Sequence, residues 1–206
     1  MNEKARARLA VGGLSTPSKM PCYSWSIPAT KCDVGMKLAK VEGSVCSDCY
    51  ALKGMYHMPN VKKAMARRLR SWKHDRVRWV SNFTKALEGE TWFRWFDSGD
   101  LQGLEMLEDI AQVAARTPWC KHWLPTKEAW IVERFKRAQN IPSNLTIRLS
   151  LPMVGMRRPR KMDSTVLTSG VVVKGETCPA KKQGHKCLEC RRCWSKGVKH
   201  VTYQAH

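Results

Sequence analysis

The middle of the chain alternates short apolar runs with amphipathic segments, and this alternation constrains the fold most. The runs TWFRWF, CKHWLPT and NLTIRLSLP predict strands over residues 91–96, 120–126 and 144–152. Between them, residues 103–116 and 128–140 repeat apolar side chains at helical spacing. Strands separated by helices of this length are typical of βαβ units. The sequence therefore predicts an α/β fold with a mostly parallel sheet and crossover helices.

The flanking segments complete this expected architecture. Residues 1–45 are rich in Gly, Pro, Ser and Lys and predict loop with one strand, whereas GVVVKG (170–175) predicts a late strand. One long basic helix is expected from Asn60 to Leu87, with Asn60 as its N-cap. A chain of 206 residues can bury a sizeable core. We expect one α/β domain over residues 1–206, with a cysteine-rich C-terminal segment (176–206) packed on it.

Composition and charge indicate where the protein is located and which class of partner it binds. The chain has no apolar run near the ~20 residues that a membrane helix needs, and no apolar leader, so we expect a cytoplasmic protein without a membrane partner. The net charge of +20 favours a polyanion such as nucleic acid, a nucleotide or an acidic partner protein. The basic segment around residues 61–79 could follow phosphates, although a solvated helix face is the ordinary explanation for such charge.

Four of the nine cysteines lie in the C-terminal segment, at Cys178, Cys187, Cys190 and Cys193. The last three are spaced C-x2-C-x2-C, the run with which bacterial ferredoxins hold a [4Fe–4S] cluster, and Cys178 precedes a proline as the outlying ferredoxin ligand does. A structural zinc site with four cysteines is the alternative, although it usually shows two separated C-x2-C pairs. The spacing favours iron–sulfur over zinc.

A second group consists of Cys32, Cys46 and Cys49. Three thiolates leave one position of a metal or cluster open, which is typical of a reactive site. The alternatives are a zinc site completed by His57, or cysteines buried in the core. Cys22 and Cys120 lack partners in spacing, and we expect both in the core.

Polar residues follow the predicted strands. Asp97 and Asp100 come after the first of them, and residues 126–128 (Thr-Lys-Glu) end the next. The carboxyl ends of parallel strands meet at one edge of a sheet, so these side chains are expected to ring one crevice. Asp100 could instead cap the following helix. Arg148 lies on the opposite strand face from Ile147, and a charge in a buried strand needs a partner or ligand.

These features resemble two known families. Three cysteines followed by an aromatic residue, and then DSGD after a strand, are distantly similar to the radical S-adenosylmethionine (SAM) superfamily. That resemblance implies a partial TIM-barrel-like scaffold, a [4Fe–4S] cluster on Cys32, Cys46 and Cys49, and SAM held at Ser98, Gly99 and Asp100, with Arg148 as a further cofactor contact. The first gap of thirteen residues departs from the C-x3-C-x2-C of that superfamily.

A closer resemblance is to the phage "gene product eighty-eight" domain family, from about Gly13 to His206. It is carried by GSVCSDCYALKG, FRWFDSGDLQ, WLPTKE, NLTIRLS and CPAKKQGHKCLECRRCW. The resemblance implies a phage origin, hence the host cytoplasm, and a cysteine-bearing α/β scaffold; it implies no reaction.

Two functions from different classes follow. The first is an iron–sulfur protein with one or two clusters, acting as a redox enzyme or as an electron carrier with an electron-donor partner. If SAM binds, the resemblance implies its reductive cleavage to a radical that abstracts hydrogen from a substrate. One cluster shared between the two cysteine groups is a variant of this function. The second is a zinc-stabilised basic protein that binds nucleic acid.

Overall fold

Six parallel strands form the sheet at the centre of the computed structural model, which describes residues 1–205 and leaves His206 of the predicted domain outside. The strands are β1 (Tyr23–Trp25), β2 (Trp92–Trp95), β3 (Lys121–Thr126), β4 (Leu145–Ser150), β5 (Thr168–Val172) and β6 (His200–Gln204). Their order in the sheet is their order in the chain, and every neighbouring pair is parallel. The predicted α/β class is confirmed.

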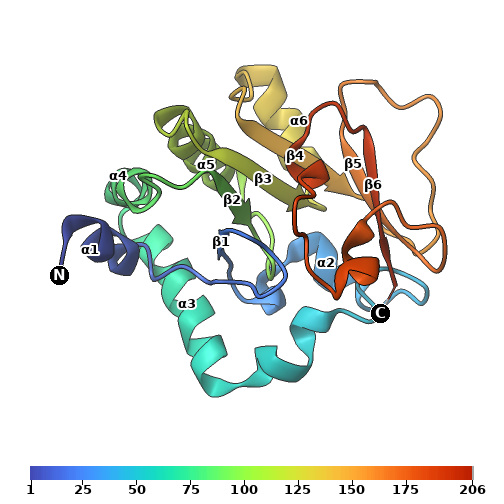
Figure 1. The fold of residues 1–206 in the computed structure, drawn as a ribbon, viewed down its shortest axis with the longest axis horizontal. Helices are drawn as coiled ribbons and strands as arrows, with labels where there is room; N and C mark the ends of the chain where they lie inside the picture. Colours follow the sequence, from blue (N-terminus) through green and yellow to red (C-terminus); the bar gives the residue numbers. More distant parts are fainter. Residues whose placement is uncertain (206) are drawn as a thin grey trace.

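Helices join the strands and gather on one face of the sheet. The α-helices are α1 (Glu3–Ala10), α2 (Asp33–Leu38), α3 (Pro59–His74), α4 (Arg76–Ala86), α5 (Leu104–Arg116) and α6 (Ala129–Ala138). Short 3-10 turns are η1 (Ala29–Lys31), η2 (Tyr50–Leu52), η3 (Gly54–His57), η4 (Pro179–Gln183) and η5 (Arg192–Trp194). The helices α4, α5 and α6 precede β2, β3 and β4 in turn and contact one another in chain order, as expected when right-handed crossovers pass the same face, whereas the β5–β6 connection carries the C-terminal segment. Figure 1 shows α4, α5 and α6 along that side and the orange-red C-terminal segment on the other.

The core lies between this helical layer and the sheet. Trp25 on β1 packs edge-on against Trp79 of α4, with ring centroids 5.3 Å apart, and Phe83 of α4 lies 4.7 Å from Trp95 on β2. All four rings are buried. Aromatic pairs in these arrangements add to the free energy gained by burying their area. Tryptophan and phenylalanine side chains therefore form the packing between β1, β2 and α4.

The alternation of side chains along a strand places charged residues on the face of the sheet away from α4, α5 and α6, here called the inner face. On β4, Ile147 joins the core whereas Arg148 points the opposite way, as the sequence predicts. The C-terminal segment covers this inner face. The indole of Trp194 donates to the carbonyl of Phe93 at 2.8 Å and packs 5.3 Å from the ring of Trp123. Residues 200–204 then add β6, a strand that the sequence analysis did not predict.

The long helix expected from Asn60 to Leu87 is wrong as a single element. Asp75 is extended (φ −155°, ψ 95°) and divides it into α3 and α4, and the Asp75 carboxylate accepts the Arg78 N–H at 2.9 Å as the N-cap of α4. The N-cap of α3 is Met58, with Pro59 at the first turn, so Asn60 does not cap it. Residues 1–45 also contain α1 and α2, where loop was expected. In the described chain, no helix has the length and apolar character to span a bilayer.

Candidate metal centre at the carboxyl edge of the sheet

Cys32, Cys46 and Cys49 come together at the carboxyl edge of the sheet. All three lie in the long connection after β1, with Cys32 directly before α2 and Cys49 directly before η2. Burial raises the pKa of Cys32 above its ordinary range, and Asp100, Cys49 and Cys46 raise it further through their charges. The three thiols are thus electrostatic neighbours, which the sequence had predicted for this group.

Gly35 makes the close approach of two of these cysteines possible. A Cβ atom at this glycine would lie 2.8 Å from the Cβ of Cys32, 3.5 Å from its Sγ and 3.8 Å from the Sγ of Cys46. Any side chain would therefore enter the space between the two thiols. Two of the three sulfur atoms thus border a space that only a glycine leaves open, and sulfur is the donor that a thiophilic metal or an iron–sulfur cluster takes.

The charge state of these thiols bears on what they can do. Burial raises the pKa of both Cys32 and Cys46, so each is a neutral thiol at neutral pH and a poor nucleophile. Binding a metal would release those protons. Lys127 is the cation beside them: burial lowers its pKa, and the neighbouring Cys46 and Asp100 act against that decrease. Within residues 1–205, no three His, Cys, Asp or Glu side chains are posed as ligands of a single ion.

The cysteine-bearing loop is tied to the strand ends. The Glu128 carboxylate, 1% exposed, accepts the Val34 N–H at 3.0 Å through Oε1 and the Trp130 indole N–H at 3.2 Å through Oε2. This fixes the first turn of α2, next to Cys32. On the other side, the Val45 N–H donates to the carbonyl of Pro152 at 2.8 Å. Contacts to the segments after β3 and β4 therefore position both parts of the loop.

The DSGD segment packs against the end of β1. The Ser98 hydroxyl donates to the Ile27 carbonyl at 3.0 Å, and the Ile27 N–H donates to the Ser98 carbonyl at 3.1 Å. Gly99 has φ +80°, and a Cβ there would lie 2.3 Å from the Ile27 side chain and 2.7 Å from its carbonyl oxygen. Only glycine fits this close approach. Packing thus explains the glycine at position 99, and the cofactor contact predicted for it stays a prediction.

Asp100 is a buried carboxyl group beside the cysteines. It accepts the Thr126 hydroxyl at 2.6 Å and the main-chain N–H groups of Lys127 and Leu101, each at 2.8 Å. Burial raises its pKa to about 6, although these three donors act to lower it. The alternative that Asp100 caps the following helix is wrong, because the N-cap of α5 is Gly103 and no side chain caps it.

Asp97 points into a cluster of hydroxyl groups that the sequence analysis did not foresee. Its carboxylate accepts the Ser24 hydroxyl at 3.1 Å and the Tyr56 hydroxyl at 3.0 Å, and its carbonyl accepts the Tyr50 hydroxyl. The preceding residue, Phe96, has φ +50°, a strained conformation for a bulky side chain. Tyr50 immediately follows Cys49, so this network lies beside the cysteine loop.

The predicted cofactor contact Arg148 lies elsewhere and holds the C-terminal segment. It is fully buried, and its guanidinium donates to the carbonyls of Cys193 (2.9 Å), Arg192 (2.9 Å), Ser195 (2.6 Å) and Val198 (2.8 Å). The sequence predicted that a charge in this buried strand needs a partner or ligand, and the partners of Arg148 are main-chain carbonyls. These contacts favour a structural role for Arg148.

The four C-terminal cysteines form a second group on the inner face. The Cys178 N–H donates to the Thr202 carbonyl at 2.9 Å, and the Cys193 thiol lies 3.2 Å from the Tyr203 hydroxyl. Burial raises the pKa of Cys187, and Cys178 and Cys190 raise it further. Cys178 likewise acts on Cys193, whose pKa burial raises to about 11. The predicted set of Cys178, Cys187, Cys190 and Cys193 therefore gathers in one region.

Cys22 and Arg94 adjoin this second group, and the sequence analysis assigned neither to it. The Cys187 N–H donates to the Lys19 carbonyl at 2.8 Å, which brings the C-terminal segment to the residues before β1. Burial raises the pKa of Cys22 to about 12, against the opposing charge of Arg94 and with a further increase from Cys187. The Arg94 guanidinium lies 4.7 Å over the Trp123 ring, and its buried Nε has no hydrogen-bond partner in the described structure.

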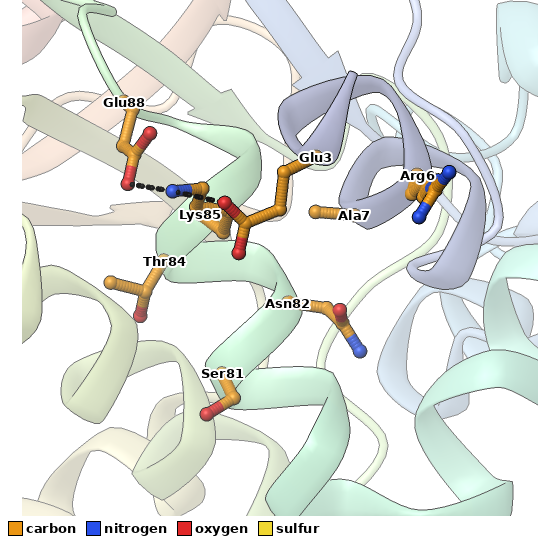
Figure 2. Close-up of a pocket in the computed structure, with 8 residues that line it drawn as sticks. All are labelled: Glu3, Arg6, Ala7, Ser81, Asn82, Thr84, Lys85 and Glu88. Carbon is orange, nitrogen blue, oxygen red and sulfur yellow. Dashed lines mark ion pairs between the residues drawn. The ribbon is translucent and has the colours of Figure 1, made fainter. Parts of the chain in front are cut away.

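Other residues considered from the sequence take ordinary places. Cys120 is fully buried in the core, as expected. His57, the residue considered for completing a zinc site, contacts the Leu52 carbonyl through Nε2 and the Lys62 ammonium at 3.3 Å through Nδ1. A groove between α1 and α4 (Figure 2) contains Lys85 paired with Glu3 at 2.8 Å and Glu88 at 3.0 Å, and none of the predicted site residues lines it.

These features define an α/β protein with a sequentially ordered parallel sheet and two groups of cysteines, one at its carboxyl edge and one on its inner face. The chain belongs to the gene product 88 family, whose model matches residues 1–178. The match includes Cys32, Cys46, Cys49 and Cys178; it ends before the C-x2-C-x2-C run, although the sequence resemblance was expected to continue to His206. No curated protein and no solved structure matches the chain.

Proposed function

We propose that the protein is an iron–sulfur protein in which Cys32, Cys46 and Cys49 hold a [4Fe–4S] cluster with one iron left without a protein ligand. The observation that carries this proposal is the convergence of the three thiols at the carboxyl edge of a parallel sheet, with Gly35 leaving room between Cys32 and Cys46. Ligand crevices of parallel sheets lie at this edge. A cluster with an open iron supplies one-electron chemistry and a place for an exogenous ligand.

The chain's own residues support such a site in three ways. Lys127 can offset the negative charge of the thiolates, since its ammonium group interacts with all three cysteines. The Glu128 contact to Val34 orients Cys32, and Gly35 keeps the space between Cys32 and Cys46 free. The main-chain positions of the three cysteines are thus held near one another, and their thiols would turn towards the cluster when it binds.

The residues predicted to hold SAM divide into two sets. Asp100 acts electrostatically on Cys32, so the DSGD segment adjoins the open position and supports a ligand there. Ser98 and Gly99 pack on Ile27, which leaves Asp100 as the polar side chain of this segment nearest the cysteines. Arg148 is committed to the C-terminal segment, and we leave it out of the proposed SAM site. We favour a redox enzyme over an electron carrier, because a carrier has no use for an open iron.

We further propose that Cys178, Cys187, Cys190 and Cys193 hold a second cluster. Four thiols with the ferredoxin-like spacing gather on the inner face, where Arg94 interacts with both Cys187 and Cys193. The buried Nε of Arg94 has no hydrogen-bond acceptor, and the negative charge of a bound cluster would offset this cation. Hydrogen bonds and cations near the sulfurs are known to tune cluster potentials.

The test is the iron, sulfide and zinc content of protein purified without oxygen. We expect about eight irons with equal sulfide in the wild type, and about four in each of two triple variants, C32S/C46S/C49S and C187S/C190S/C193S. Cys120→Ala, in the core, is the control and should keep the wild-type iron. Zinc without sulfide would overturn the proposal. For SAM, the C187S/C190S/C193S variant should show a changed electron paramagnetic resonance signal of its reduced cluster on addition of SAM; an unchanged signal contradicts SAM binding.

A further inference from the structure

Helix α3 presents a row of unpaired cations. The exposed cations of this helix that take part in no ion pair are Lys62, Lys63, Arg67, Arg70 and Lys73. The helix contains no Asp or Glu. Lys63, Arg70 and Lys73 also form no hydrogen bond with the rest of residues 1–205, so their charges face solvent alone.

These cations lie on one side of the helix. At 100° per residue they fall within an arc of about 140°, and the buried Met65, Leu69 and Trp72 fall in a separate arc of about 60°. Arg67 and Arg68 anchor the helix by donating to the carbonyls of Gly12 (3.1 Å) and Gly13 (2.9 Å). Figure 1 shows α3 at the edge of the molecule, away from the sheet. The basic face is therefore both one-sided and accessible.

The apolar and aromatic residues of α3 indicate which kind of anionic partner its cations could bind. A membrane-surface helix needs an apolar face free to enter the lipid, and the apolar face of α3 is buried in the protein. Single-stranded nucleic acid is usually held by stacking its bases on aromatic side chains, and the one aromatic residue of α3, Trp72, is buried. A regular row of Lys and Arg without aromatic residues instead fits the phosphates of a duplex.

We propose that the basic face of α3 binds the phosphate backbone of duplex nucleic acid without reading its sequence. This inference goes beyond the iron–sulfur function and does not depend on it, because α3 contains no cysteine. The five cations predict a slope of about −4.5 for the logarithm of the binding constant against the logarithm of salt concentration. The helix is held in place before binding by the packing of Met65, Leu69 and Trp72 and by the hydrogen bonds of Arg67 and Arg68.

The experiment measures binding of the full-length protein to a fluorescein-labelled DNA duplex of arbitrary sequence, by anisotropy at several salt concentrations. The test variant is K63E/R70E/K73E. Its matched control is R134E/K136E/R137E, which makes the same charge change on the exposed side of α6. We expect the test variant to lose at least tenfold in affinity at low salt and to reduce the slope by about 2.7. The control should stay within about threefold of the wild type, because affinity depends on these α3 cations and not on net charge alone.

Three outcomes would overturn this proposal. The first is wild-type protein that does not bind the duplex, and the second is an equal loss in the two variants, which would assign binding to net charge alone. The third comes from vesicles containing phosphatidylserine: if K63E/R70E/K73E loses vesicle binding and keeps its affinity for DNA, the face is a membrane surface. Circular dichroism of both variants checks that α3 and α6 remain folded.

Discussion

The carboxylate of Glu128 accepts the main-chain N–H of Val34 at 3.0 Å, so the start of α2 is held by the residue that precedes α6. Glu128 belongs to the β3 end and Val34 to the cysteine loop, which are 94 residues apart in the chain. This contact helps to position Cys32 relative to the sheet, together with the hydrogen bond from the Gln102 side chain to the Lys31 carbonyl at 2.8 Å. It is a positioning contact, because it acts on the proposed cluster ligand through the helix.

Replacement of Glu128 tests this role. Glu128→Ala removes the carboxylate that accepts from the partly buried N–H groups of Val34 and Trp130, and we expect the free energy of unfolding to fall by about 1–3 kcal/mol. Glu128→Gln retains an acceptor oxygen and should lose much less. Denaturant titration of the metal-free protein measures this, with the exposed Glu133→Ala as control. In anaerobically purified protein, Glu128→Ala should also carry less iron; wild-type iron content would contradict its positioning role.

Substitution of Gly35 tests the space between the cysteines. Gly35→Ala places a methyl group 2.8 Å from the Cβ of Cys32, and we expect loss of iron from the carboxyl-edge site while the iron of the inner-face site remains. The control is Gly197→Ala, whose nearest neighbour is the Ser195 hydroxyl at 3.6 Å, in ordinary contact. Iron and sulfide per chain are the readout. Retention of all iron in Gly35→Ala would show that the three thiols do not share a ligand.

Replacement of Arg148 should release the C-terminal segment. Arg148→Met removes the hydrogen bonds to the carbonyls of Arg192, Cys193, Ser195 and Val198, and these partly buried groups lose their donor. We expect trypsin to cut the segment much faster, since it is rich in Lys and Arg. Limited proteolysis followed by mass spectrometry locates the cuts. Arg137→Met, on the exposed side of α6, is the control, and equal cleavage of the two variants would refute the anchoring role.

His122 makes the fold sensitive to acid. Trp95 donates to Nδ1 at 3.3 Å, so Nε2 carries the proton and donates to the Thr117 hydroxyl at 2.8 Å. Burial lowers the pKa of His122 from 6.5 to about 3. Below pH 6.5 the imidazole is therefore protonated in the unfolded chain but stays neutral in the folded chain. Stability should therefore fall as the pH decreases from 6.5 towards 3, by at most about 1.4 kcal/mol per pH unit.

Denaturant unfolding at several pH values between about 4 and 7 measures this effect. His122→Gln should show a weaker loss of stability on acidification, even if it is less stable at neutral pH, because the amide does not titrate. His74→Gln, on the exposed side of α3, should keep the wild-type dependence. If His122→Gln and the wild type lose stability in parallel, His122 is not the source of the acid sensitivity.

The strands of the middle region could be predicted from sequence because their side chains carry a strong local signal. In β4 the alternation of Ile147 and Arg148 assigns one to each face, and the structure follows it. In contrast, β1 has three residues, too few to show a period, and in β6 the only buried apolar side chain is Val201, so its apolar signal is weak. The break at Asp75 was missed because apolar residues continue at helical spacing on both sides of it.

Partners far apart in the chain were harder to foresee. Because the carboxyl ends of parallel strands meet at one edge, Asp100 and residues 126–128 were predicted to lie together. The hydrogen bonds from Thr126 and Lys127 to Asp100 confirm this. Cys22 and Cys187 carry no shared motif, and they meet only because the C-terminal segment returns to the residues before β1. Arg94, however, could have been found: it is a charge in a buried strand, the same signal that singled out Arg148.

The carbonyls around Arg148 also impose an order of events during synthesis. Arg148 is synthesised before residues 192–198, so its guanidinium lacks these acceptors until the C-terminal segment docks. Until then the inner face of the sheet, with Arg94 and Trp123, lies open to solvent. Docking of the C-terminal segment covers that face and gives Arg148 its acceptors.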